Sequence, residues 1–199
     1  MKNSSRTKIY LVSGGTHAGK TTLINEIASS GYSIISESAM DVISGLHGTV
    51  GLERSIEWRQ VNPSAFQELI ALTQRFREES VQKAGLNICF SDRGVIDAIA
   101  YSKLYEIPIS ELLQRIAKES VYEHAFLLEQ IPQFDSRDGT GRLCDAKDAI
   151  NAELIIEREL NNRGIPVTRI PFMTAANRTT MVLSVVSQSN LDLLLCNPA

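Results

Sequence analysis

Cysteine is scarce in this sequence of 199 residues. The three cysteines, Cys89, Cys144 and Cys196, lie far apart, and their number is odd. This pattern excludes a disulfide framework or a zinc site as an organising feature and is typical of proteins in a reducing compartment. We interpret the three side chains as small apolar residues that fill space.

Long apolar runs are also missing. No such run approaches the ~20 residues that a membrane-spanning helix needs. The first residues, MKNSSRTKIYLV, lack the hydrophobic centre of a signal peptide. We therefore expect a cytoplasmic protein without a membrane span.

An excess of one charge is missing as well. The formal net charge is only -3, so there is no electrostatic reason to expect binding to nucleic acid. Hydrophobic residues make up 43% of the chain, and no internal repeat, low-complexity tract or long linker divides it. These features predict one domain over residues 1–199 and leave the oligomeric state unpredicted.

Short apolar segments alternate with longer helical patterns along the chain. The expected strands are 8–13, 32–35, 87–91, 124–128 and 167–170. The expected helices include 21–29, 63–84 and 145–163, each followed closely by a glycine. Strands separated by helices predict an α/β fold, in which a five-stranded parallel sheet has helices on both faces.

Apolar residues in the two long helices repeat at helical spacing. In the helix over 63–84, Asn62 is the expected cap and Pro63 lies in the first turn. Its predicted apolar face is made of Phe66, Leu69, Ile70, Thr73 and Phe76. In the helix over 145–163, the residues predicted to be buried are Ala149, Ile150, Leu154, Ile156 and Leu160.

The segment GGTHAGKT, residues 14–21, lies between an expected strand and an expected helix. Gly14, four residues and then Gly19-Lys20-Thr21 form the phosphate-binding loop pattern in its required context. Glycines let successive N–H groups point at an anion, and the helix adds the positive end of its dipole. The pattern predicts a bound nucleoside triphosphate, ATP or GTP. The residues assigned to nucleotide binding here are Gly14, Gly15, Thr16, His17, Ala18, Gly19, Lys20, Thr21 and Thr22.

Individual roles follow within this loop. We expect Lys20 to reach the outer phosphates and the Thr21 hydroxyl to bind Mg²⁺, an ion that prefers phosphate, hydroxyl and carboxylate oxygens. The side chain of His17 is expected to point away from the phosphates, so we assign its backbone, and not catalysis, to the site.

Charged residues follow two other expected strands. Asp92 and Arg93 come directly after the strand over 87–91, and Glu37 follows the strand over 32–35. At the carboxyl edge of a parallel sheet, Asp92 could bind Mg²⁺, Arg93 could stabilise phosphoryl oxygens, and Glu37 could act as a general base. The alternatives are a helix cap with a surface ion pair for Asp92 and Arg93, and an acid in a first helical turn for Glu37.

The polar stretch FDSRDGTGRL, residues 134–143, carries glycines and two arginines, Arg137 and Arg142. It predicts a lid-like segment at about residues 130–144 that closes over the triphosphate. A solvated loop without a catalytic role is the alternative.

The motifs GGTHAGKTTL, SESAMDVI, SDRGVIDAIAY, DGTGRL with Asp145-Ala146, and RGIPVTRIP with Asn177-Arg178 occur in this order over residues 8–186. The ordered set resembles the AAA-type predicted ATPase family related to nicotinamide riboside kinase. The resemblance implies a fold like that of nucleoside and nucleotide kinases, with ATP or GTP and Mg²⁺ at the phosphate loop. It also implies active-centre roles for Asp92 and Arg93, a lid role for Arg142 and a nucleotide-binding role for Arg178. Relatives often have an arginine where this chain has Met40.

These observations predict a phosphotransferase that moves the γ-phosphoryl group of ATP to a small, nucleoside-like acceptor, with Lys20, Glu37, Asp92, Arg93 and Arg142 as catalytic residues. The acceptor pocket is expected between Glu37, Trp58 and the helix with Gln67 and Gln74, although we favour a core role for Trp58 and water-facing glutamines. A nucleotide-dependent switch that recruits a partner is the alternative function.

Overall fold

The computed structural model describes residues 6–130 and 146–196, and within the second range it describes the side chains of residues 147–188. Most of the predicted lid, with Arg137 and Arg142, therefore lies outside the described residues, as does Cys144. Cys89 is buried and free. Within the described part of the chain, no helix is both long and apolar enough to span a membrane.

The described strands form one parallel sheet in the order β2-β3-β1-β4-β5. These strands are β1 (Lys8–Gly14), β2 (Ser33–Ile35), β3 (Ile88–Asp92), β4 (His124–Leu128) and β5 (Val167–Ile170). Their positions agree with the predicted strands to within about one residue at each end. The predicted α/β fold with a five-stranded parallel sheet is thus confirmed.

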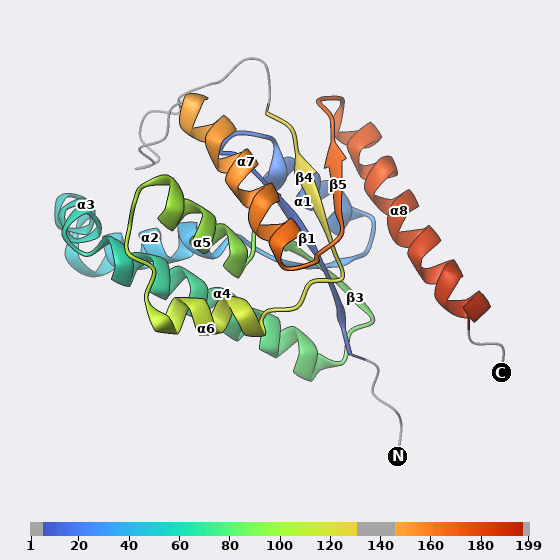
Figure 1. Cartoon of the computed structure of the whole chain (residues 1–199), viewed down its shortest axis with the longest axis horizontal. Helices are drawn as coiled ribbons and strands as arrows, with labels where there is room; N and C mark the ends of the chain where they lie inside the picture. The colour runs from blue at the N-terminus through green and yellow to red at the C-terminus, as the bar shows by residue number, and fades with distance from the viewer. Residues whose placement is uncertain (1–5, 131–145, 197–199) are drawn as a thin grey trace.

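The central strand β1 contributes alternate residues to two hydrophobic clusters, one on each face of the sheet. Ile9 and Leu11 join one cluster, and Tyr10 and Val12 join the other. Buried side chains of α5 (Val95–Leu104), α6 (Glu111–Glu119) and α7 (Ala146–Asn162) belong to the first cluster. Those of α1 (Lys20–Ser29) and α8 (Ala175–Cys196) belong to the second. Figure 1 shows α7 and α8 at different sides of the sheet. Burial on both faces explains why β1 and β4 are mostly apolar.

Three helices connect β2 to β3: α2 (Ser38–Val50), α3 (Leu52–Val61) and α4 (Pro63–Ala84). Pro63 starts α4, as predicted. Asn62 is the N-cap residue, also as predicted, but its side chain makes no capping hydrogen bond, because Asn62 Nδ2 donates to the Trp58 carbonyl oxygen at 3.1 Å.

The predicted apolar face of α4 is correct only in part: Phe66, Ile70 and Thr73 are partly buried, but Leu69 and Phe76 are exposed. Leu69 is 39% exposed and Phe76 is 71% exposed. The buried residues of α4 are Gln67, Ala71, Gln74 and Glu78. In α7, Ala149, Ile156 and Leu160 are buried as predicted, whereas Ile150 and Leu154 are about half exposed, at 51% and 50%. Apolar spacing alone therefore does not identify which helix face meets the sheet.

A hydrogen-bond network explains how α4 buries polar residues. Gln74 Oε1 accepts from Ser38 Oγ at 2.8 Å, and Gln74 Nε2 donates to Ser91 Oγ at 2.8 Å and to Glu78 Oε1 at 3.0 Å. Tyr122 Oη donates to the same Glu78 oxygen at 2.6 Å. Burial raises the pKa of Glu78, and these donors oppose that rise. Because each polar group has a partner, its burial is tolerated.

Candidate active site

The phosphate-loop pattern forms a tight turn between β1 and α1. Gly19 has φ 86°, a left-handed conformation that favours glycine, and α1 begins at the next residue. Gly15 lies against the backbone of α7, because a Cβ atom added to it would sit 2.2 Å from the Ala149 carbonyl oxygen. The local sequence and the packing of α7 therefore both determine the shape of the loop.

The close approach at Gly15 leads to a stability prediction. We expect Gly15→Ala to lower the free energy of unfolding by roughly 1–3 kcal/mol, because the added methyl group must push the loop and α7 apart. Urea unfolding monitored by circular dichroism measures this change. Gly45→Ala is the matched control: Gly45 is helical with open space around its Cβ position, so alanine should stabilise the protein by about 0.5–1 kcal/mol. A loss at Gly45 as large as that at Gly15 would contradict the packing argument.

Lys20 is buried within the loop. Its Nζ atom donates to the Gly15 carbonyl oxygen at 2.6 Å. Burial lowers the pKa of Lys20 to about 7, and the charge of Arg93 acts in the same direction. A buried cation beside inward-facing backbone is suited to an anionic ligand, which would stabilise the charged ammonium group.

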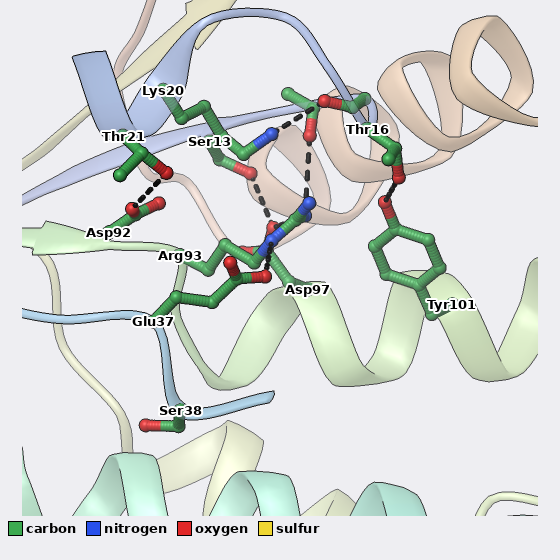
Figure 2. A network of polar contacts seen from close by, with 12 residues as sticks. Ser13, Thr16, Lys20, Thr21, Glu37, Ser38, Asp92, Arg93, Asp97 and Tyr101 are labelled. Carbon is green, nitrogen blue, oxygen red and sulfur yellow. Dashed lines mark hydrogen bonds and ion pairs between the residues drawn. The ribbon is translucent and has the colours of Figure 1, made fainter. Parts of the chain in front are cut away.

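Thr21 and Asp92 come together from α1 and β3. Thr21 Oγ1 donates to Asp92 Oδ2 at 3.2 Å (Figure 2). Asp92 Oδ1 is buried and has no hydrogen-bond partner among the described residues. Burial raises the pKa of Asp92, and the charge of Lys20 opposes this rise. One hydroxyl and one orphaned carboxylate oxygen fit a Mg²⁺ ion that takes its other ligands from phosphate and water.

Arg93 lies at the centre of a buried ionic network. Its Nε atom donates to Glu37 Oε1 at 2.8 Å, and Nη1 donates to Asp97 Oδ1 at 3.2 Å. The guanidinium group also lies over the Tyr101 ring, 5.2 Å from its centroid. Burial alone would lower the pKa of Arg93, but Tyr101 and the neighbouring carboxylates raise it well above its ordinary value. The structure thus brings Glu37 and Arg93 together at the carboxyl edge of the sheet, as Figure 2 shows.

The remaining residues assigned to nucleotide binding have different surroundings. Thr16 Oγ1 lies 3.1 Å from Tyr101 Oη, whereas the side chain of Thr22 is exposed. His17 has φ 65°, which is unusual for a residue other than glycine.

Arg178, at the start of α8, bonds the backbone around the phosphate loop. Its Nη1 atom donates to the Ala18 carbonyl oxygen at 2.6 Å, Nη2 donates to the Glu129 carbonyl oxygen at 3.3 Å and Nε donates to the Pro171 carbonyl oxygen at 3.1 Å. The geometry is that of a positioning residue, because all three contacts go to backbone groups of the protein.

A cavity of about 480 Å³ opens beside the ionic network. Thr16, Glu37 and Arg93 line this cavity. Thr16 belongs to the phosphate loop. Arg93 Nη1 donates to the Gly14 carbonyl oxygen of that loop at 3.4 Å, and Arg93 in turn bonds Glu37. Most of the other wall is apolar or aromatic, with Ile43, Ile56, Phe66, Ile70, Tyr101, Tyr105 and Ile107. A pocket with this composition, a few polar groups and one charged end is suited to a small organic ligand.

The cavity changes one expectation. Gln67 and Gln74 are buried and line it, so the prediction that they face water is wrong. Trp58 does not line it, and neither does Met40, which is half-buried in the first turn of α2.

Asp97 and Tyr101 were missed as site residues. Asp97 accepts hydrogen bonds from Ser13 Oγ at 2.7 Å and from the Gly94 amide at 3.0 Å, in addition to its bond with Arg93. Its position three residues after Gly94, the N-cap residue of α5, was a usable signal, since an acidic residue at this position often bonds the start of its helix. Tyr101, four residues further along, carried no comparable signal.

The fold of this chain is similar to that of several solved structures. Two crystal structures of NadR protein, one in complex with NAD and AMP-PNP and the other with NR, have TM-scores of 0.62 and 0.63 at 17% and 15% identity. Each alignment covers 93% of this chain, which spans about half of the NadR chains, at 50% and 51%. Thymidylate kinase from Ehrlichia chaffeensis has a TM-score of 0.58 at 11% identity, with 91% of this chain and 99% of that chain covered. At these identities the similarity shows a shared fold, that of P-loop kinases.

Curated protein sequences provide no match to this chain. The family model described as AAA domain matches residues 9–178, a range that includes the phosphate loop, the ionic network and Arg178. This match confirms the family resemblance predicted from the ordered motifs. The chain therefore belongs to this AAA domain family.

Proposed function

We propose that this protein is a phosphotransferase that moves the γ-phosphoryl group of ATP, or of GTP, to a small nucleoside-like acceptor. One observation carries the proposal: the cavity and the phosphate loop share an edge formed by Thr16, Glu37 and Arg93. A triphosphate on the loop and an acceptor in the cavity would meet at this edge. Phosphoryl transfer depends mainly on such positioning and on charge neutralisation.

The phosphate loop would hold the triphosphate through its backbone N–H groups and through Lys20. Arg178 would act indirectly, because it bonds the Ala18 carbonyl oxygen within the loop. Thr21 and Asp92 would hold Mg²⁺, which neutralises charge on the phosphate oxygens when bound. Arg142 remains a predicted lid residue, outside the described part of the chain.

Glu37 is the candidate general base for an acceptor hydroxyl, since it lines the cavity at the shared edge. Its Oε1 atom accepts from Arg93, which holds the carboxylate in place. Arg93 in turn bonds two carboxylates, Glu37 and Asp97. A hydroxyl acceptor at this end could donate its proton to Glu37, while Arg93 offsets the charge of the two carboxylates.

We expect Glu37→Gln to lower acceptor-dependent turnover by roughly 10²–10⁴-fold, because the amide keeps the shape but cannot accept the hydroxyl proton. Hydrolysis without an acceptor should change much less. Both rates can be measured by a coupled assay of nucleoside diphosphate release. Glu57→Gln, on the exposed side of α3, is the control and should leave both rates unchanged. An equal loss of both rates in Glu37→Gln would argue against a base role.

A turnover screen tests the proposed function itself. The purified chain with Mg·ATP or Mg·GTP would be assayed against nucleosides, nucleotides and phosphorylated sugars. Turnover that rises with one acceptor, with a phosphorylated product detected by mass spectrometry, is expected. Slow hydrolysis that no acceptor stimulates would instead support the nucleotide-dependent switch.

A further inference from the structure

Gln67 stands out among the residues of the cavity wall. It is only 7% exposed, and it lines the cavity. Within the part of the chain that the structure describes, its side-chain amide makes no hydrogen bond. The Gln67 amide atoms are not among the fully buried atoms of the described residues that lack a partner, so they are accessible from the cavity, where a ligand or water can bond them.

Gln74, two helical turns further along α4, provides a contrast within the same cavity. Its amide is also buried, but Ser38, Ser91 and Glu78 satisfy it from three different elements. Gln74 therefore has a structural role, while Gln67 retains an unused donor and an unused acceptor. Gln67 and Gln74 thus lie on one face of α4 with the same side-chain chemistry. Among the described residues, the protein supplies hydrogen-bond partners only to the amide of Gln74.

We infer that Gln67 is a specificity-determining residue that binds the amide edge of a flat ring in the acceptor. An amide side chain can pair with a group that carries a donor beside an acceptor, namely a carboxamide or a ring lactam. The neighbouring walls suit a flat ring, because Phe66 and Tyr101 are aromatic and Ile70 is apolar. The acceptor is therefore a hydroxyl compound that also carries an aromatic carboxamide or a lactam ring.

This inference rests on the proposed function in one respect: the ligand of the cavity is taken to be the phosphoryl acceptor. The recognition itself requires no nucleotide and no chemistry. It can therefore be tested by binding alone, with probes that lack a transferable hydroxyl group.

Two matched pairs of probes separate amide recognition from simple apolar contact. Uracil and benzamide carry the donor–acceptor edge, whereas 1,3-dimethyluracil and methyl benzoate keep the flat ring and lack the donor. Ligand-observed NMR with the full chain measures the dissociation constants. We expect the wild-type protein to prefer the amide probe of each pair by roughly tenfold, as the loss of one hydrogen bond in a buried site predicts.

Two nearly isosteric variants provide the decisive comparison. Gln67→Met should abolish the preference and should leave the unfolding temperature about equal, because the Gln67 amide makes no hydrogen bond within the described protein that the variant would lose. Gln74→Met should lower the unfolding temperature, because Glu78 and Ser38 lose partners, and should keep the preference. If Gln74→Met does not fold, the comparison of Gln67→Met with the wild type still decides.

Several results would overturn the inference. These are a preference that persists in Gln67→Met, wild-type binding without preference, and no binding of either amide probe at millimolar concentration. A failed turnover screen with intact amide preference would count against the phosphotransferase and not against Gln67. The opposite result is turnover that depends on acceptors without the amide edge and has the same rate in Gln67→Met as in the wild type. It would count against the role of Gln67 and not against the phosphotransferase.

Discussion

Lys20→Ala should lower nucleotide turnover by about a thousandfold and weaken the binding of Mg·ATP, because one preorganised cation is lost from the phosphate site. The ammonium group lies inside the loop, 2.6 Å from the Gly15 carbonyl oxygen, where few water molecules can screen its charge. Its removal should leave the fold intact, since a buried lysine with a lowered pKa contributes little to stability without a ligand. Isothermal titration calorimetry and a turnover assay would measure both effects.

The control for this prediction is Lys118→Ala, which removes an exposed lysine of α6 and should change neither quantity. Circular dichroism must show that Lys20→Ala is folded. If a folded Lys20→Ala protein bound and turned over nucleotide like the wild type, the phosphate-loop interpretation would lose its basis.

Asp92→Asn should lower turnover by roughly a thousandfold while nucleotide binding is largely retained, since a metal-held charge is worth several kcal/mol in the transition state. Asparagine keeps the size of the side chain and can still bond Thr21, but it lacks the negative charge. The orphaned Oδ1 atom is the feature of this site that most needs a ligand. Turnover should be measured over a range of Mg²⁺ concentrations, and the variant should require more Mg²⁺ for half-maximal rate.

Asp41→Asn is the matched control, because Asp41 pairs with Arg77 at the protein surface and not in the site. Its turnover and Mg²⁺ requirement should equal those of the wild type. Near-wild-type turnover in Asp92→Asn, at the same Mg²⁺ concentration, would leave Asp92 with a structural role at the start of α5.

The positions of the strands and of the phosphate loop were predictable because their signals are local. A strand buried on both faces is a short apolar run, and residues 124–128 show it without help from the rest of the chain. The phosphate-loop pattern needs Gly14, four further residues and then Gly19-Lys20-Thr21, so it is complete within eight residues. The order of the motifs also predicted the family correctly.

The site residues were predictable to different degrees. Glu37 and Arg93 each follow a strand, which places them at one edge of the sheet. Their ion pair joins residues 56 positions apart in the chain, and a motif of a few residues cannot predict a contact over so long a sequence separation. Asp97 shows the same limitation, because its contact with Ser13 spans 84 positions.

The sequence alone thus determined the position of the phosphate-loop pattern and of the charged residues that follow β2 and β3. Only the tertiary structure decided which face of α4 is buried. That face is mostly polar, since three of its four buried residues are Gln67, Gln74 and Glu78. The physical reason is that buried polar side chains need hydrogen-bond partners. Other elements of the fold supply them: Ser38 and Ser91 bond Gln74, and Tyr122 bonds Glu78. The same packing buries Gln67 at the cavity wall without a partner, so its role depends on surroundings that helical periodicity does not describe.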